Sequence, residues 1–454
     1  MVLQQITALV VSIAFMVWLI LRSRLSAFPA LILGALAMGL LTGMEPVSVA
    51  TEIAAGVGNT MKSIGMVIGL GVMLGKLLEQ SGAAKSLALA FIRWFGKGRE
   101  PAAMAGAGYV VSIPIFSDSG FVILFELAKA LSRVSKRSIL LFSFALSAGL
   151  GATHLAVPPT PGPIAVAEFF GVDLGVMIFY GIIVSIPTTI AGVLIAYWVE
   201  KQIYHIPDGK GGWTREKPAE SEIQADSFAD ASENLPGAFV SFLPIFLPLV
   251  LILLRTTMTT IAGPDATSTF LTIVSFLGQP YVAILVGLIA GMLTLGRATP
   301  QKKMSRIMND SLGAAGIIIF VTCGGGAFGH IIRTSGVGEA IGQMAVNANL
   351  PLLILPFVVT VVLKIAQGSG TVAMLTSAAI TAPIFANVDI NPVLPALMAC
   401  MGGMFMSHFN DSFFWVFTKL NGIEEMETFK YHTLPKCVEG LAGVAMVLIL
   451  SIFI

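Results

Sequence analysis

The sequence has few charged residues. Only 11% of its 454 residues are Asp, Glu, Lys or Arg, whereas 56% are hydrophobic, and a soluble domain usually carries about 25% charged residues. This deficit, together with apolar runs of about 18 residues or more, argues against a soluble protein and predicts an all-α polytopic membrane protein. The net charge of +1 argues against nucleic acid as a partner.

Cysteine is scarce as well. Cys323, Cys400 and Cys437 are scattered in apolar surroundings, a pattern that predicts neither a disulfide framework nor a metal site. The sequence contains no HExxH, CxxC, Walker or nucleophile-elbow motif, and the Gly-rich "TCGGGAFG" is interpreted as a helix-packing face. We therefore expect no enzyme, no metal and no cofactor.

The basic residues indicate an orientation, because cytoplasmic loops collect Lys and Arg. The first apolar run, "LQQITALVVSIAFMVWLILRSR", is too long for a cleaved signal peptide and predicts a retained first span. With both termini outside, all but four of the 26 basic residues fall in six clusters that lie inside: residues 22–24, 76–99, 129–137, 201–217, 297–306 and 419–436.

One polar segment divides the chain. Residues 201–236 are rich in Gly, Pro and acidic residues, which is typical of a solvated connector. We therefore predict a first membrane repeat over residues 1–200 and a second over residues 237–454, joined by a cytoplasmic linker.

The two halves carry the same landmarks in the same order. The segment "MLGKLLEQSGAAKSLA" matches "AFGHIIRTSGVGEAIG", "FSDSGFVIL" matches "AQGSGTVAML", and "GLGATH" matches "GMFMSH", each about 250 residues apart. Since internal repeats decide architecture, we predict two repeats of about five spanning helices each.

Each half also contains an apolar segment too short to cross twice. About 30 residues separate Arg99 from Arg133, broken at "SDSG", whereas two crossings need about 40 residues. Residues 350–385 show the same pattern, broken at "AQGSG". We predict re-entrant hairpins that enter from opposite faces, so that the repeats are inverted and the tips meet near the midplane.

A discontinuous helix is predicted after each hairpin. Four prolines in "HLAVPPTPGP" forbid a continuous α-helix, and "SHFNDS" replaces apolar residues over nearly two turns. Broken backbone at membrane depth lines a cavity or is buried in protein, and its helix ends offer N–H groups to an anion and carbonyls to a cation.

Polar residues at the tips and breaks form the candidate site. An ionised Asp at mid-membrane costs about 2.5–3.5 kcal/mol, so Asp118 is predicted to couple transport to a proton or cation, with a structural hydrogen bond as the alternative. Lys364 is predicted to pair with a carboxylate, either the substrate's or that of Asp118, unless it snorkels outward. His154, His408 and Asp411 are further candidates for proton handling. The candidate substrate-binding residues are Ser117, Ser119, Gly120, His154, Pro159, Thr160, Lys364, Gln367, Ser369, Gly370, Thr371, His408, Asn410 and Ser412.

Four of these segments, "IPIFSDSGFVIL", "GATHLAVPPTPGP", "GSGTVAMLT" and "SHFNDSFFWVFTK", together resemble the gluconate permease family of bacterial proton-coupled symporters, within the ion transporter superfamily. The resemblance covers essentially the whole chain. It implies uptake of gluconate or a related small hydroxy or sugar acid with protons across the bacterial inner membrane. The orientation indicated by the basic clusters then places both termini in the periplasm. The superfamily further implies a homodimer and an elevator-like transport domain. Thr160 stands where the family often has His, and Phe413 where it often has Gly, so the particular acid stays open.

Two other functions remain as alternatives. The carbonyls at the helix breaks are also suited to binding Na⁺. A sodium-coupled carboxylate or D-hydroxyamino-acid transporter is therefore one alternative. An anion channel is disfavoured, because the polar tips leave no continuous charged pore lining.

Overall fold

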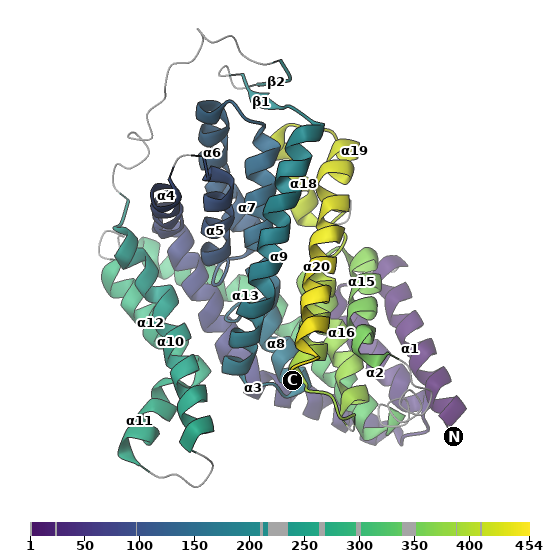
Figure 1. The fold of residues 1–454 in the computed structure, drawn as a ribbon. Coiled ribbons are helices and arrows are strands. Elements are labelled where there is room, and N and C mark those ends of the chain that lie inside the picture. The colour runs from purple at the N-terminus through teal and green to yellow at the C-terminus, as the bar shows by residue number, and fades with distance from the viewer. Residues whose placement is uncertain are drawn as a thin grey trace.

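The computed structural model describes residues 2–22, 25–96, 98–208, 212–216, 235–262, 268–296, 301–337, 351–386, 388–408 and 411–454 (Figure 1). These ranges are almost entirely helical, as the composition predicts. The helices are α1 (Val2–Arg22), α2 (Ala27–Leu41), α3 (Pro46–Gln80), α4 (Ala83–Phe95), α5 (Glu100–Val111), α6 (Ser117–Ser135), α7 (Ile139–Ala156), α8 (Pro161–Phe170), α9 (Leu174–Gln202), α10 (Ala238–Ala262), α11 (Thr269–Leu277), α12 (Pro280–Thr294), α13 (Gln301–Thr334), α15 (Leu355–Gln367), α16 (Gly370–Phe385), α17 (Val393–Met404), α18 (Ser412–Asn421), α19 (Glu425–Thr428) and α20 (Leu434–Leu450).

Several helical segments are long and apolar enough to cross a membrane. Within the described ranges there are five, Ile139–Phe170, Leu174–Gln202, Ala238–Ala262, Met304–Thr334 and Glu425–Leu450, or up to seven if two bent pairs each count as one span. This is fewer than the roughly ten crossings predicted, because other apolar helices, among them Ala27–Leu41, have only 10–17 residues. The protein is therefore a multi-pass membrane protein with many short helices.

A helical hairpin occurs in each half, close to the predicted positions. Helices α5 and α6 are joined by residues 112–116, and α15 and α16 are joined at Gly368 and Ser369. Gly368 has a φ of +85°, a conformation that glycine adopts without a steric penalty. The first hairpin lies in the upper part of Figure 1 and the second in the lower part. Their re-entrant position in a membrane stays a prediction.

Both predicted helix breaks are present. Residues 157–160 separate α7 from α8, and residues 405–411 separate α17 from α18. The prolines explain the first break, since an interior proline removes a backbone hydrogen bond and clashes with the preceding turn. In the second, Met406 has a φ of +56°, which costs a residue with a side chain about 1–2 kcal/mol.

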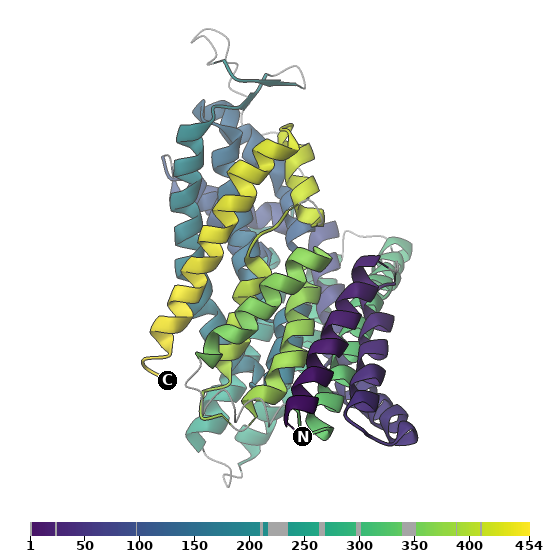
Figure 2. The same ribbon diagram turned by 90° about the vertical axis from the view of Figure 1, so that its right-hand side faces the viewer.

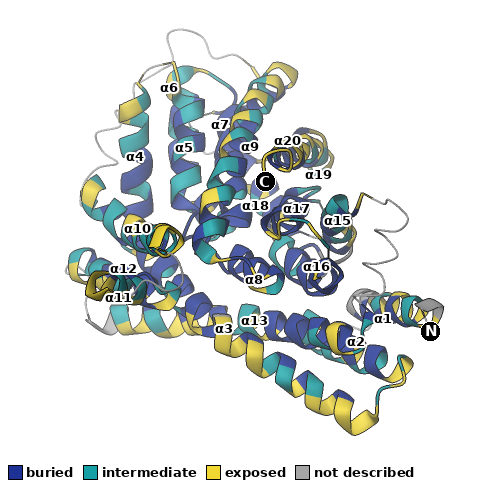
Figure 3. Cartoon of the chain, turned by 60° about the horizontal axis from the view of Figure 1, so that its bottom comes forward, coloured by how far each residue is buried: buried dark blue, intermediate teal, exposed yellow. Residues whose placement is uncertain are grey.

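The long helices α3 and α13 pack along each other. A Cβ at Gly56 would lie 2.7 Å from the Cα of Ala327, and one at Gly326 would clash with the Thr60 hydroxyl. The Gly-rich stretch is therefore a packing face, as the sequence analysis predicted. Figure 3 shows that the opposite side of α3 is exposed, whereas almost every residue of α7 and α17 is buried.

Paired glycines of the sequence repeat make corresponding contacts. A Cβ at Gly75 of α3 would clash with the carbonyl of Pro114, at the tip of the first hairpin. A Cβ at the matching Gly329 of α13 would lie 2.7 Å from the carbonyl of Ala379, in the second hairpin. In each half, a long helix thus approaches the backbone of that half's hairpin.

The described part of the expected linker is ordered against the helices. Strands β1 (Ile206–Pro207) and β2 (Trp213–Thr214) pair antiparallel at the top of Figure 1, while both termini lie in its lower half. Trp213 stacks on His205 with ring centroids 4.9 Å apart. The sequence analysis did not predict this small sheet.

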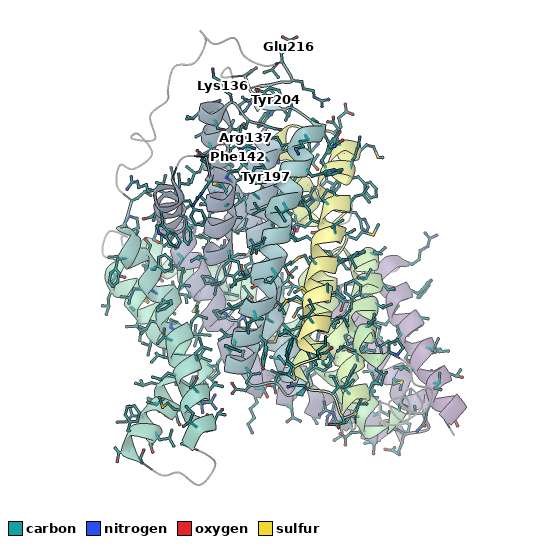
Figure 4. The ribbon with its side chains drawn as sticks, viewed as in Figure 1. Lys136, Arg137, Phe142, Tyr197, Tyr204 and Glu216 are labelled. Carbon is teal, nitrogen blue, oxygen red and sulfur yellow. The ribbon has the colours of Figure 1, made fainter. Side chains whose placement is uncertain are left out.

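Polar contacts tie the α6–α7 connection to α9 at the same end (Figure 4). Arg137 forms an ion pair with Glu200, and its guanidinium lies 5.2 Å from the ring centroid of Tyr197. The Tyr204 hydroxyl donates a hydrogen bond to the Lys136 carbonyl at 3.3 Å. These contacts hold the C-terminal end of α6, the end that lies away from the hairpin tip.

Candidate functional site

The hairpin tips and helix breaks border a cavity of about 490 Å³. Residues far apart in the sequence reach it because the two halves interdigitate: α6 and α7 come from the first, and α15, α16, α18 and α20 from the second. Ten of the predicted site residues line this cavity: Ser117, Asp118, Ser119, His154, Lys364, Ser369, Gly370, Thr371, Asp411 and Ser412.

The structure does not place four other predicted residues, Gly120, Pro159, Thr160 and His408, among those that line the cavity. Gly120 allows close packing, since a Cβ there would lie 2.7 Å from a Leu150 methyl group. Thr160 holds the first helix break, because its hydroxyl donates to the His154 carbonyl at 2.9 Å. Asn410 and the side chain of Gln367 lie outside the described residues.

Asp118 occupies the first turn of α6, where the positive end of the helix dipole favours an anion. The Ser412 hydroxyl donates a 2.6 Å hydrogen bond to its Oδ2, and Ser117 lies 3.5 Å from its Oδ1. Since Ser412 begins α18, this contact joins the first hairpin to the broken helix of the second half.

Lys364 is buried and forms an ion pair, but its partner is not Asp118. Its Nζ lies 3.6 Å from Oδ2 of Asp411, and the two side chains are only 4% and 12% exposed. Nζ also donates a 2.6 Å hydrogen bond to the Gly403 carbonyl at the end of α17. Asp411 in turn caps α18 by accepting from the Phe413 N–H at 3.1 Å. Lys364 therefore does not snorkel outward. Its ammonium group links the end of α17 to the residue that caps α18, on the two sides of the second break.

His154 connects the first broken helix with the second hairpin. Its Nε2 lies 3.5 Å from the Thr371 hydroxyl, and its ring lies 5.4 Å from that of Phe116 at the first tip. The two histidines predicted to be equivalent differ in position. His154 belongs to the last turn of α7, whereas His408 lies beyond the end of α17, because the second break begins earlier.

The sequence analysis missed a second group of lining residues. Ser147 and Gly151 of α7, His432 in the π-helical turn Phe429–Thr433, and Lys436 of α20 all border the cavity. The sequence analysis counted Lys436 with a cluster of loop residues, but the residue is only 4% exposed and lies inside the helix bundle. Lys76 of α3 also lines the cavity rather than a loop. A charged residue inside a membrane-length apolar segment is the signal that identifies such positions.

The cavity has a polar side and an apolar side. The polar side comes from the tips and breaks, and the apolar side includes Ile317, Ile318 and Val321 of α13. Carboxylates, ammonium groups, hydroxyls and two imidazoles therefore surround a space large enough for a small polar solute, a combination suited to an anion with several hydroxyl groups. Within the described ranges there is no cluster of three or more His, Cys, Asp or Glu residues that could hold a metal ion.

Comparison with known proteins gives consistent matches over the whole chain. The sequence matches the GntP family permease profile over residues 4–453. It is 39% identical to an uncharacterized permease of Haemophilus influenzae, a match that covers 99% of this chain and 92% of the relative. It is 34% identical to a gluconate permease of Pseudomonas aeruginosa, covering 97% and 96%. The crystal structure of the Alcanivorax borkumensis YdaH transporter is similar in fold, with a TM-score of 0.63 at 18% identity, covering 94% of this chain and 97% of that one.

Proposed function

The chain belongs to the GntP family of permeases, which are transporters and not enzymes, and we propose that it is a symporter for gluconate or a related small hydroxy or sugar acid. It moves the acid inward with protons across the bacterial inner membrane. The observation that carries this proposal is the cavity shared by both halves, which Asp118 and Lys364 both line.

Asp118 is the proposed proton carrier. An ionised carboxylate only accepts hydrogen bonds, and a protonated one also donates. Protonation therefore changes what Asp118 offers both to Ser412, 2.6 Å away, and to a hydroxyl of the acid. Since Ser412 begins α18, the change reaches the broken helix of the second half. The serine and threonine hydroxyls at the tips form hydrogen bonds with the substrate hydroxyls.

The backbone carbonyls at the helix breaks favour proton coupling over sodium coupling, because they already accept hydrogen bonds from protein side chains. The Gly403 carbonyl accepts from Lys364 at 2.6 Å, and the Ser407 carbonyl accepts from the Thr433 hydroxyl. In the first break, the Thr160 hydroxyl contacts the carbonyls of His154 and Val157. Carbonyls that already accept from protein donors are poorer ligands for Na⁺, which needs several oxygens at once.

The arrangement in the membrane belongs to the same proposal. Both hairpins are re-entrant, the termini face the periplasm, and residues 201–236 are cytoplasmic. Support comes from the opposite ends of the molecule at which the termini and the β1–β2 sheet lie. An elevator-like movement of a transport domain and a homodimer, both implied by the superfamily resemblance, complete the proposal.

The test is uptake into proteoliposomes with Asp118→Asn. We expect loss of accumulation driven by a pH gradient and retention of gluconate exchange at equal pH, because exchange needs no net proton movement. Glu126→Gln is the matched control, since Glu126 lies on the same helix with a side chain that is 74% exposed. Full concentrative uptake by Asp118→Asn, or accumulation that follows a sodium gradient instead, would contradict the proposal.

A further inference from the structure

The cavity contains a second buried ammonium group, away from the hairpin tips. Lys436 of α20 is 4% exposed, and its Nζ donates to the Ser147 carbonyl at 3.0 Å and lies 2.9 Å from Oε2 of Glu439. An ammonium group has three N–H donors. Among the described contacts, the hydrogen bond to Ser147 uses one of them and the ion pair with Glu439 takes at most one more. At least one N–H therefore remains for a ligand, on an ammonium group that also lies 5.8 Å from the ring centroid of Phe144.

The counterion of Lys436 lies behind it rather than in the cavity. Glu439 is fully buried and does not border the cavity, whereas Asp411, the counterion of Lys364, does. A carboxylate of the substrate that approached Lys364 would meet the negative charge of Asp411 in the same space. At Lys436 it meets the ammonium group first, with Glu439 on the far side.

The space in front of Lys436 is kept open by a glycine. A Cβ at Gly151 would lie 3.0 Å from Nζ of Lys436, so a larger residue would crowd the ammonium group where both residues border the cavity. Beside it, His432 is fully buried and borders the same space. Its Nε2 lies 3.2 Å from the Ser147 hydroxyl, while its Nδ1 has no hydrogen-bond partner among the described residues.

We propose that Lys436 binds the carboxylate of the substrate, with His432 as a neighbouring polar contact and Gly151 as the residue that leaves room for it. The hydroxyl-bearing end of the acid then extends toward Asp118 and Thr371. Glu439 is a positioning residue, since it holds the ammonium group in place without reaching the ligand. This assignment rests on the proposed function and replaces Lys364 as the expected carboxylate partner.

The test is equilibrium binding to the purified full-length protein in detergent, with gluconate and its uncharged analogue gluconamide as probes. Lys436→Met is expected to weaken gluconate binding about tenfold to a hundredfold, because a hydrogen bond to a charged group contributes about 1.5–3 kcal/mol. Gluconamide binding should change little. Lys430→Met is the matched control, because Lys430 is exposed and lies six positions earlier in the chain.

A second variant separates recognition from structure. If Lys436 and Glu439 only stabilise the fold, the neutral double variant Lys436→Met/Glu439→Gln regains both thermal stability and gluconate affinity. If Lys436 is the anion anchor, the double variant regains stability but stays weak for gluconate. Gly151→Ala, which leaves both charges in place, should also weaken gluconate more than gluconamide.

The outcomes distinguish this assignment from the function on which it rests. Equal losses for gluconate and gluconamide in Lys436→Met, or restored gluconate affinity in the double variant, overturn the assignment alone. Failure of the unaltered protein to bind any acid in a panel of sugar acids and hydroxy acids overturns the proposed function as well. Because binding is measured without a proton gradient, failure of proton coupling does not affect the result.

Discussion

Removal of the charge on Asp411 should destabilise the protein strongly. In Asp411→Asn, the ammonium group of Lys364 would remain in a site where its side chain is only 4% exposed, without a counterion at 3.6 Å. Breaking a buried ion pair by removing one partner costs about 3–5 kcal/mol, because the other charge stays buried and uncompensated. We expect the free energy of unfolding to fall by that amount.

The substitution isolates the charge from the helix cap. An Asn side chain still presents an oxygen to the Phe413 N–H, which Asp411 contacts at 3.1 Å, and Asn caps helices about as well as Asp. The control is Asp310→Asn, which breaks the ion pair with Arg306, a pair whose side chains are 84% and 70% exposed. Such exposed helix pairs contribute only about 0.3–0.5 kcal/mol.

The assay is denaturant unfolding of the purified protein in detergent micelles, with the two variants compared under the same conditions. The double variant Lys364→Met/Asp411→Asn should recover most of the loss, because it leaves no buried charge. A loss in Asp411→Asn no greater than that in Asp310→Asn would refute the reasoning. It would mean that Lys364 finds another anion or reaches water.

Two further predictions concern the backbone around the cavity. Gly149→Ala should greatly reduce the yield of folded protein, because the new Cβ would overlap the Ala105 carbonyl of the first hairpin. Gly58→Ala is the control: among the described residues, nothing outside its own stretch of helix would lie within 4 Å of the new Cβ. It should be neutral or slightly stabilising, since Ala is favoured over Gly in a helix by about 0.8–1.0 kcal/mol. Size-exclusion profiles of the two proteins check this, and a normal profile for Gly149→Ala would contradict it. Thr160→Val should lower the free energy of unfolding by about 1–3 kcal/mol, because it removes the hydroxyl that donates to two buried carbonyls of the first break. Thr334→Val, at an exposed helix position, is its control, and equal effects of the two valine substitutions would show that the bond at the break is dispensable.

The breaks in the helices could be predicted from the sequence because their causes are local. Prolines interrupt the helix before Pro161, and the polar run around Asp411 interrupts the other. The position of the first hairpin tip was less accurate. The sequence analysis centred it on Ser117–Gly120, whereas α6 already begins at Ser117, because short polar residues are also favourable in the first turn of a helix.

The contacts across the cavity could not be predicted, because they depend on how the halves pack. Nothing in the sequence near Lys364 specifies that Asp411, from another helix, is its partner. Lys436 was missed for a different reason. Basic residues near the ends of apolar runs were counted as loop residues, but Lys436 lies in the first turn of α20 and is buried in the bundle.

The central claim is that residues from both halves form one substrate site, and an experimental structure with gluconate bound tests it most directly. The account predicts that the acid occupies the 490 Å³ cavity and contacts Asp118 of the first half together with Thr371 and Lys436 of the second. Gluconate bound outside this cavity, or held by residues of one half alone, would contradict it.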